Sequence, residues 1–219
     1  MTLPAGLTVL HADEALLALD KPAGLLSVPG RGADKQDCLS ARVQRLYPDA
    51  LIVHRLDMAT SGLLLMARGA DMQRRLSMAF EARAVHKRYV AVVTGHVQAP
   101  EGNGWREIDL PLLTDWPNRP LQKVDAAGKP SLTRWRVLAH EQDATGRAQT
   151  RLELEPVTGR SHQLRVHLQA IGHPILGDAL YADAEARARS PRLLLHASAI
   201  ALPHPLNGTP LQLDSPVPF

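Results

Sequence analysis

Short apolar runs separated by turn residues recur along the chain, and this pattern constrains its fold more than any other feature of the sequence. Most of the runs are too short for helices, and some alternate apolar with polar residues as half-buried strands do. The regular succession of strand, helix and strand that marks a parallel sheet does not occur. The chain is therefore expected to form an α+β fold with a mixed, mostly antiparallel sheet and flanking helices. The strands are expected at residues 7–10, 15–19, 51–53, 63–67, 89–93, 132–138, 150–154, 193–202 and 211–213.

Helical spacing of apolar residues is confined to three segments, residues 38–46, 71–81 and 161–171. Asp71 stands near the start of the second helix, where a short polar side chain can cap free backbone N–H groups. Ser161 is expected to cap the third helix, and Gly172 to end it. Residues 98–130 are rich in Gly, Pro, Trp and charge, and they are expected to leave the core as a long excursion.

Size and composition indicate one globular domain. The chain has 219 residues, of which 45% are hydrophobic, and this is enough to bury a substantial single core. We therefore expect residues 1–219 to form a single domain. The net charge of +3 and the excess of arginine over lysine are compatible with a nucleic-acid partner, because arginine binds phosphate through a bidentate fork and stacks on bases.

The only cysteine, Cys38, cannot form a disulfide within one chain, which fits a reducing compartment. The N-terminal segment lacks the basic and apolar regions of a signal peptide. No apolar run is long enough to span a membrane. A cytoplasmic monomer without a membrane partner is therefore expected.

The stretch IVHRLDMATSGLLLM, residues 52–66, places two charged side chains between two apolar runs. One interpretation is structural, because an aspartate followed by Thr-Ser-Gly is typical of a turn. The other is chemical, because catalytic groups often sit on loops between rigid strands and an ionised carboxylate can attack a sugar carbon. Arg55 and the arginines of residues 158–167 favour the second interpretation, since a nearby arginine would keep Asp57 ionised. The residues alone leave both interpretations open.

Other catalytic motifs are missing from the sequence. The histidines and the single cysteine lack zinc-ligand spacing, and there is no Gly-x-Ser-x-Gly elbow of a serine hydrolase. The HRLD sequence is similar to the kinase catalytic loop, but neither a glycine-rich phosphate loop nor an Asp-Phe-Gly motif accompanies it. No metal and no cofactor are therefore expected.

Six blocks of sequence, in order over nearly the whole chain, carry a resemblance to a known family. They are KPAGLLSVPG (21–30), VHRLDMATSGLLLMA (53–67), KRYVAVVTG (87–95), GKPSLTRWRV (128–137), TGRSHQLRVHLQAIGHPILGD (158–178) and RLLLHA (192–197). Together they resemble the RluA family of pseudouridine synthases, for which HRLD followed by TSG is a specific signature. The resemblance implies that family's fold, with a central RNA-binding cleft. LLTDWPNRPLQKV, residues 112–124, is similar to the dual-specificity branch, whose substrates are a 23S rRNA hairpin and tRNA anticodon stem-loops.

The resemblance implies an isomerase that breaks the N1–C1′ bond of uridine, turns the uracil and rejoins it through C5 without a cofactor. Asp57 matches the family's catalytic aspartate, which acts on the ribose either as a nucleophile at C1′ or as a base. Arg165 matches its basic partner, and Tyr89 matches the tyrosine that stacks on the uracil and helps to remove the C5 proton. Leu195 is a candidate for the apolar wall of the base pocket.

Ordinary structural roles for the same residues stay open when the residues are considered alone. Arg165 is then an exposed helix arginine, Tyr89 a half-buried strand tyrosine and Leu195 a core residue.

The target uridine has to leave its RNA stack before it can react. Arg55 is the candidate for filling the vacated space, since it lies beside Asp57 and its guanidinium can stack on bases. Phosphate contacts are expected from Lys21, Arg31, Lys87, Arg88, Arg119, Lys123, Lys129 and Arg160. No N-terminal S4-type RNA-binding domain is expected before the catalytic blocks, and structured RNA is the expected partner.

Two other functions stay open. One is a non-catalytic RNA-binding module on the same fold, which would not require Asp57, Tyr89 and Arg165 together. The other is a nucleoside glycosidase, which needs a second carboxyl group, and Asp178 is only a distant candidate for it. Chemical mapping of pseudouridine separates both alternatives from the isomerase.

Overall fold

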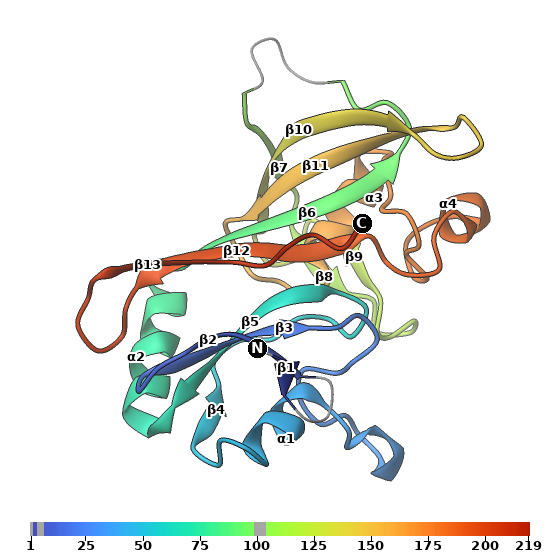
Figure 1. Ribbon diagram of the computed structural model, residues 1–219. Helices are drawn as coiled ribbons and strands as arrows, with labels where there is room; N and C mark the ends of the chain where they lie inside the picture. Colours follow the sequence, from blue (N-terminus) through green and yellow to red (C-terminus); the bar gives the residue numbers. More distant parts are fainter. Residues whose placement is uncertain (1, 4–6, 99–103) are drawn as a thin grey trace. The chain divides into compact units, whose positions relative to one another are not determined.

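The computed structural model describes residues 2–3, 7–98 and 104–219, and these form two compact units (Figure 1). The first unit consists of Met1–Lys87 and His196–Pro218, and the second consists of Arg88–Leu195 with Phe219. Both are built on β-strands, and helices are fewer than strands among the described residues. The α+β architecture expected from the sequence is confirmed.

The first unit contains a mixed sheet. Its strands follow the order β1 (Thr2–Leu3), β2 (Leu7–Ala12), β3 (Leu16–Lys21), β5 (Ser61–Arg68) and β12 (Leu195–Pro203), with β4 (Ala50–Ile52) on β5 and β13 (Pro210–Asp214) on β12. β5 and β12 are parallel, whereas the other pairs of this unit are antiparallel. The unit also contains η1 (Ala33–Lys35), α1 (Leu39–Gln44) and α2 (Gly69–Glu81).

The centre of this sheet is buried because β3 and β5 are almost entirely apolar. Leu16, Leu17, Leu63 and Leu64 have no exposed surface. Helix α2 packs on β4 and β5 and contributes the buried Leu76 (Figure 1). Strands covered on both faces are continuous apolar runs in the sequence, which is why the sequence predicts these two strands closely.

At Gly62 the backbones of β5 and β12 approach too closely for a side chain. Its φ is 107°, and a Cβ atom there would lie 2.3 Å from the carbonyl oxygen of Ala197. Beside it, the buried Ser61 hydroxyl bonds to Nδ1 of His196 at 2.8 Å, and Nε2 of His196 bonds to the Ser215 hydroxyl at 3.0 Å. The serine and glycine that follow the HRLD sequence therefore have a structural role in strand pairing.

The second unit contains an antiparallel sheet in the order β6 (His86–Thr94), β11 (Ala148–Pro156), β10 (Leu132–Gln142) and β7 (Arg106–Asp109). A separate hairpin joins β8 (Leu112–Thr114) to β9 (Gln122–Val124), and the helices are α3 (Gln163–Ala170) and α4 (Ala184–Ala188). In β11 the buried Leu152 and Leu154 alternate with the half-buried Arg151 and Glu153. This period of two shows that only one face of the strand is covered by the core.

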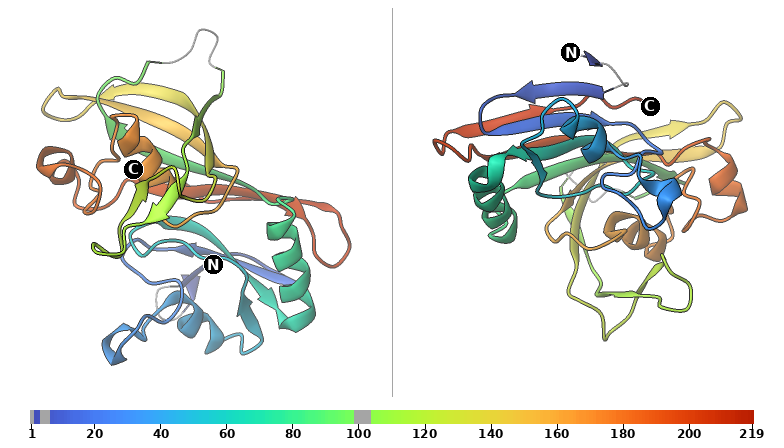
Figure 2. Two further views of the ribbon diagram at one scale, coloured as in Figure 1. Left: turned by 180° about the vertical axis from the view of Figure 1, so that it is seen from behind. Right: turned by 90° about the horizontal axis from the view of Figure 1, so that it is seen from below.

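Helix α3 packs beside β9 and β10 (Figure 2). Gln163 and His167 both hydrogen-bond to the buried Thr133 hydroxyl, at 3.0 and 2.9 Å, and burial lowers the pKa of His167 so that its ring stays neutral. The helix begins after His162, whose φ of 55° is left-handed, and no side chain caps it. The expectation that Ser161 caps the helix is wrong, because His162 occupies the position before its first turn.

The excursion expected at residues 98–130 is more regular than the sequence predicts. It contains β7, which pairs with β10, and the hairpin of β8 and β9, in which Leu112 lies opposite Val124. These strands are too short to show a period of two in the sequence. Residues 99–103 of this segment lie outside the described residues.

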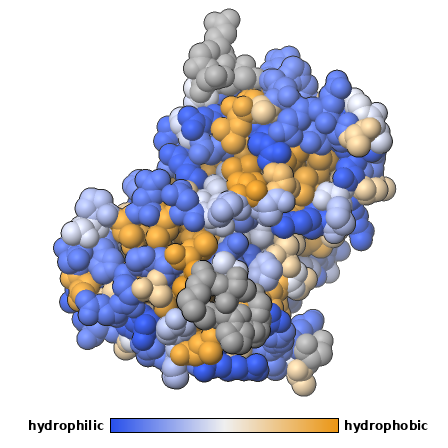
Figure 3. All heavy atoms as spheres, viewed as in Figure 1, coloured by the Kyte–Doolittle hydropathy of each residue, from blue (hydrophilic) through white to orange (hydrophobic). Residues whose placement is uncertain are grey.

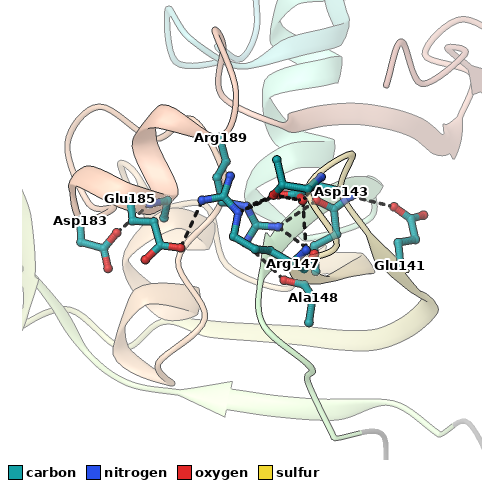
Figure 4. A network of polar contacts seen from close by, with 10 residues as sticks. Glu141, Asp143, Arg147, Ala148, Asp183, Glu185 and Arg189 are labelled. Carbon is teal, nitrogen blue, oxygen red and sulfur yellow. Dashed lines mark hydrogen bonds and ion pairs between the residues drawn. The ribbon is translucent and has the colours of Figure 1, made fainter.

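A network of ion pairs attaches α4 to the turn between β10 and β11 (Figure 4). The side chain of Arg189 is 5% exposed and donates to Asp143 at 2.9 Å. Arg147 pairs with Asp143 at 3.2 Å and with Glu185 at 3.4 Å. The hydrogen bond from the Thr145 hydroxyl is the main cause that holds the pKa of Asp143 below its usual range. Asp143 therefore stays charged and keeps the turn fixed to the helix.

On the face drawn in Figure 3, hydrophobic residues form small patches separated by hydrophilic ones. Three large hydrophobic side chains of the described chain are more than half exposed: Met58 at 52%, Met78 at 62% and Trp116 at 63%. Over the described ranges, no helix combines the length and the apolar character needed to cross a membrane.

Candidate active site

Asp57 lies on the loop between β4 and β5, residues 53–60, and this loop is fastened on both sides of the aspartate. On one side the Ser27 hydroxyl donates to the carbonyl of Leu56 at 2.7 Å and accepts the N–H of Leu56 at 3.1 Å. On the other side the carbonyl of Met58 accepts the N–H of Gly24 at 2.8 Å. The half-buried carboxylate of Asp57 is therefore carried by backbone that is held in place at both neighbouring residues.

Lys21 supports the same loop from inside the protein. Its side chain has no exposed surface, and its ammonium donates to the carbonyls of Pro22, Leu25 and Met58 at 2.9, 2.8 and 3.1 Å. A buried ammonium group requires partners of this kind. The expectation that Lys21 contacts phosphate is wrong, because its charge is used within the fold to fix the loop that carries Asp57.

We predict that Lys21→Met lowers the free energy of unfolding by about 2–4 kcal/mol, because the carbonyls of Pro22 and Leu25 lose a buried donor. Urea unfolding measures the change. Lys35→Met is the matched control, since Lys35 is exposed and its replacement is expected to stay within about 0.5 kcal/mol of wild type. Equal stability of the two variants would contradict the proposed role of Lys21.

His54 fixes the start of the loop. Its Nε2 accepts the N–H of Leu65 at 2.9 Å, and its ring centroid lies 4.8 Å from that of Phe80. Burial, helped by the positive charge of Lys87, lowers the pKa of His54 to about 3. The ring therefore stays neutral and acts as a backbone acceptor, which gives the histidine of the HRLD sequence a structural role.

Arg55 is exposed, as a residue that enters RNA has to be. On the other side of Asp57, the exposed Met58 lines an open depression of about 530 Å³ together with residues 22–26. Lys35, Asp37 and Arg42 complete its lining. This depression is open to solvent, and Asp57 is not part of its lining.

Arg165 and Asp178 form a buried, bidentate ion pair in the second unit. Nε and Nη2 of Arg165 donate to the two carboxylate oxygens at 2.8 and 2.7 Å, and the two side chains are 4% and 0% exposed. Asp178 also accepts the N–H groups of Leu180 and Tyr181 at 2.9 and 3.2 Å. The interpretation of Arg165 as an exposed helix arginine is wrong. A carboxylate bonded at both oxygens is also a poor candidate for the second acid of a glycosidase.

Tyr181 and His162 connect this ion pair to the hairpin of β8 and β9. The guanidinium carbon of Arg165 lies 5.0 Å from the ring centroid of Tyr181. The Tyr181 hydroxyl bonds to Nδ1 of His162 at 2.6 Å and accepts the N–H of Gln122 at 2.9 Å. The sequence analysis did not name Tyr181 or His162 as candidate site residues. The only signal was their position: His162 lies within the block at residues 158–178 that resembles the family, and Tyr181 follows it.

Tyr89 and Leu195 belong to the second unit, although Leu195 is the first residue of β12 and the rest of that strand belongs to the first unit. Tyr89 is half-buried on β6 and lies opposite Leu154 of β11. Directly opposed residues of antiparallel strands point to the same face, so the ring of Tyr89 stands on the face that carries the buried Leu154. Leu195 is 3% exposed at the start of β12, a burial that suits a core residue and a pocket wall equally.

The residues expected to contact phosphate differ in their surroundings. Arg88 donates to Glu155 at 2.9 Å, and Lys123 pairs with Asp125 at 3.0 Å, so both charges have a counterion within the protein. Burial lowers the pKa of Lys87. Four others are exposed: Arg31, Arg119, Lys129 and Arg160.

The candidate residues are divided between the two units. Arg55 and Asp57 belong to the first, whereas Tyr89, Arg165 and Leu195 belong to the second. In the part of the chain that the structure describes, no group of three or more His, Cys, Asp or Glu side chains is arranged to hold a metal ion. The catalytic and RNA-binding roles of these residues stay predictions.

A family model described as RNA pseudouridylate synthase matches residues 15–170, and the chain belongs to this family. The chain is 48% identical over 214 residues to the dual-specificity RNA pseudouridine synthase RluA of Escherichia coli (strain K12), covering 97% of this chain and 94% of that protein. It is 52% identical over 198 residues to the protein of the same name from Vibrio parahaemolyticus, covering 90% and 78%. These matches confirm the RluA-family resemblance.

A solved structure supports the same assignment of the fold. Human RNA pseudouridylate synthase domain containing 1 superposes on this chain with a TM-score of 0.80 at 28% sequence identity. The superposition covers 97% of this chain and 84% of the human chain. The pseudouridine synthase fold expected from the sequence blocks is therefore confirmed.

Proposed function

We propose that this protein isomerises specific uridines to pseudouridine in a 23S rRNA hairpin and in tRNA anticodon stem-loops. The observation that carries the proposal is the setting of Asp57, a half-buried carboxylate on a loop held at Leu56 by Ser27 and at Met58 by Lys21. A fixed carboxylate suits attack at one sugar atom, because correct positioning removes much of the entropic barrier to reaction. Identity of 48–52% to dual-specificity relatives supports the choice of the two RNA classes.

In the proposed reaction, Asp57 acts on the ribose of the target uridine. As a nucleophile it attacks C1′ and forms an ester while the N1–C1′ bond breaks and the uracil leaves as an anion. The uracil turns, its C5 attacks C1′, and the ester bond to Asp57 breaks, which frees the carboxylate. As a base Asp57 removes a sugar proton while the N1–C1′ bond breaks to give a glycal, and the proton returns to the sugar when C5 bonds to C1′. Tyr89 stacks on the uracil and assists the loss of the C5 proton, and Leu195 borders the base. The reaction is an internal rearrangement and needs no second substrate.

Arg165 supplies the positive charge that the proposed chemistry requires. Its bidentate pair with Asp178 uses Nε and Nη2 and fixes the plane of the guanidinium. A guanidinium that is already oriented by a buried carboxylate loses little entropy when it acts on a further group. In this proposal Asp178 is a positioning residue, and Arg165 is the basic partner in the reaction.

The proposed partner is structured RNA in the cytoplasm, bound by a monomer without a metal or cofactor. The exposed Arg31, Lys129 and Arg160 are proposed to contact phosphates. Arg88 is paired with Glu155 and Lys123 with Asp125, so each has to leave this partner before it can bind a phosphate of the RNA. Their share of binding is therefore expected to be smaller.

Arg55→Ala is expected to lower isomerisation of a folded stem-loop by about 100-fold, because extruding a stacked base costs a few kcal/mol that Arg55 offsets. Activity on a short flexible RNA with the same target is expected to change little. Arg45→Ala is the matched control, since Arg45 is also an exposed arginine of the first unit. Equal losses on the folded and the flexible RNA would count against a base-flipping role.

The proposal is tested by incubating wild-type protein with transcripts of a tRNA anticodon stem-loop and of a 23S rRNA hairpin, followed by chemical mapping of pseudouridine. Modification of one uridine in each RNA supports dual specificity. Modification of only one RNA narrows the substrate class. Binding without modification would leave the RNA-binding module as the function, and release of free uracil would establish a glycosidase.

A further inference from the structure

Trp116 is exposed although tryptophan is a residue that proteins usually bury. Of the three tryptophans in the sequence, Trp135 is 5% exposed and Trp105 is half-buried under the guanidinium of Arg88, whereas Trp116 is 63% exposed. An indole in that position contributes little to a core. Its exposure leaves the indole available to a ligand from outside the chain.

The turn that carries Trp116 is held in one conformation. The N–H of Asp115 donates to Leu121 at 3.0 Å, and the N–H of Asn118 donates back to Asp115 at 3.1 Å. The side chains of Asn118 and Asp115 are also bonded, at 2.9 Å. A rigid turn presents an aromatic ring without the entropic cost of ordering it on binding.

Arg119 gives the indole one partner and leaves most of it accessible. The guanidinium carbon of Arg119 lies 3.9 Å from the ring centroid of Trp116, which is the distance of a cation–π stack on one face. The 63% exposure of Trp116 is measured with Arg119 in this position, so the stack leaves most of the indole accessible. A flat ligand can therefore add to the stack.

The base of this hairpin is attached to the residues proposed to act in the reaction. The N–H of Gln122, at the start of β9, donates to the Tyr181 hydroxyl, and the ring of Tyr181 packs against the Arg165 guanidinium. The hairpin therefore holds Trp116 in a fixed relation to Arg165 within the second unit.

We propose that Trp116, backed by Arg119, stacks on an unpaired base of the RNA substrate other than the target uridine. The inference rests on the proposed function, which supplies an RNA with unpaired bases. Aromatic side chains bind such bases by stacking regardless of sequence. The negative charges of Asp115 and Asp125 offset the positive charges of Arg119 and Lys123 in the same segment. Stacking, and not electrostatic attraction, is therefore the main contribution of this hairpin to the affinity for RNA.

The test compares Trp116→Ala and Trp116→Phe with wild type for binding to an anticodon stem-loop and for pseudouridine formation. Trp116→Ala is expected to raise Kd roughly 5- to 150-fold, the effect of one base–aromatic stack, and to leave the slope of log Kd against log salt unchanged. Trp116→Phe retains a ring and is expected to recover most of the affinity.

Stem-loops with 2-aminopurine at single unpaired positions identify the stacked base. Fluorescence at one position is expected to be quenched by the wild-type protein and by Trp116→Phe but not by Trp116→Ala. Met78→Ala, which removes another exposed hydrophobic side chain, is the control and is expected to bind as wild type does. Unchanged Kd for Trp116→Ala, or quenching that survives it at every position, overturns the inference. Failure of wild type to form pseudouridine would instead overturn the proposed function, and the stacking result would stand separately.

Discussion

Asp57→Asn is expected to abolish pseudouridine formation, with a loss of at least about 10⁴-fold in single-turnover rate. Asparagine has nearly the same shape as aspartate, but it carries no charge and cannot act as a nucleophile or a base at the ribose. The backbone contacts of Ser27, Gly24 and Lys21 with the neighbouring residues do not involve the carboxylate. The variant is therefore expected to fold and to bind RNA.

The matched control is Asp49→Asn, which neutralises an exposed aspartate of the same unit that pairs with Arg68. Exposed ion pairs contribute little to stability, so this variant is expected to retain full activity. Circular dichroism and stem-loop binding establish that Asp57→Asn is folded. Residual activity of Asp57→Asn within tenfold of wild type would show that another group performs the chemistry.

Asp178→Asn is expected to lower the free energy of unfolding by about 3–5 kcal/mol, because it leaves the buried Arg165 guanidinium without a counterion. Activity is expected to fall with it, since the guanidinium is no longer held in one plane. Urea unfolding gives the stability, and pseudouridine formation under conditions where the variant remains folded gives the activity. Asp125→Asn breaks the pair with Lys123 and is expected to leave the stability close to that of wild type, because solvent screens exposed ion pairs.

A double variant separates the structural role of this pair from its chemical role. Replacing both partners, as Arg165→Met with Asp178→Leu, removes both buried charges and is expected to recover much of the stability lost in Asp178→Asn. It is expected to remain inactive, because the proposed basic partner of the reaction is absent. Recovery of activity together with stability would limit Arg165 to a structural role.

The parts of the fold that the sequence predicts well are those with a strong local pattern. β3 and β5 are continuous apolar runs because both of their faces are covered, and α2 shows helical spacing around the buried Leu76. β7, β8 and β9 lie in the segment that the sequence predicts only as a long excursion from the core. Each strand is too short to display a period and depends on pairing with a partner strand.

Features that lie in one short motif were predictable, and features that depend on tertiary contacts were not. The roles of Arg55 and Asp57 in the reaction stay predictions. Their position on a loop follows from the apolar strands predicted on both sides of the HRLD sequence. The burial of Lys21 does not, because a lysine is normally exposed and its three carbonyl acceptors come together only in the folded loop. The pair of Arg165 with Asp178 spans 13 residues, and no helical or strand period connects them.

The central claim, that the protein isomerises uridine without losing the base, is tested most directly with a stem-loop transcript that carries tritium at C5 of uridine. Rejoining uracil through C5 displaces the C5 hydrogen, so the claim predicts tritium release into water at one equivalent per modified uridine. The mass of the unlabelled RNA is predicted to stay unchanged after complete reaction. Absence of tritium release, or a fall in RNA mass that matches the loss of uracil, would contradict the claim.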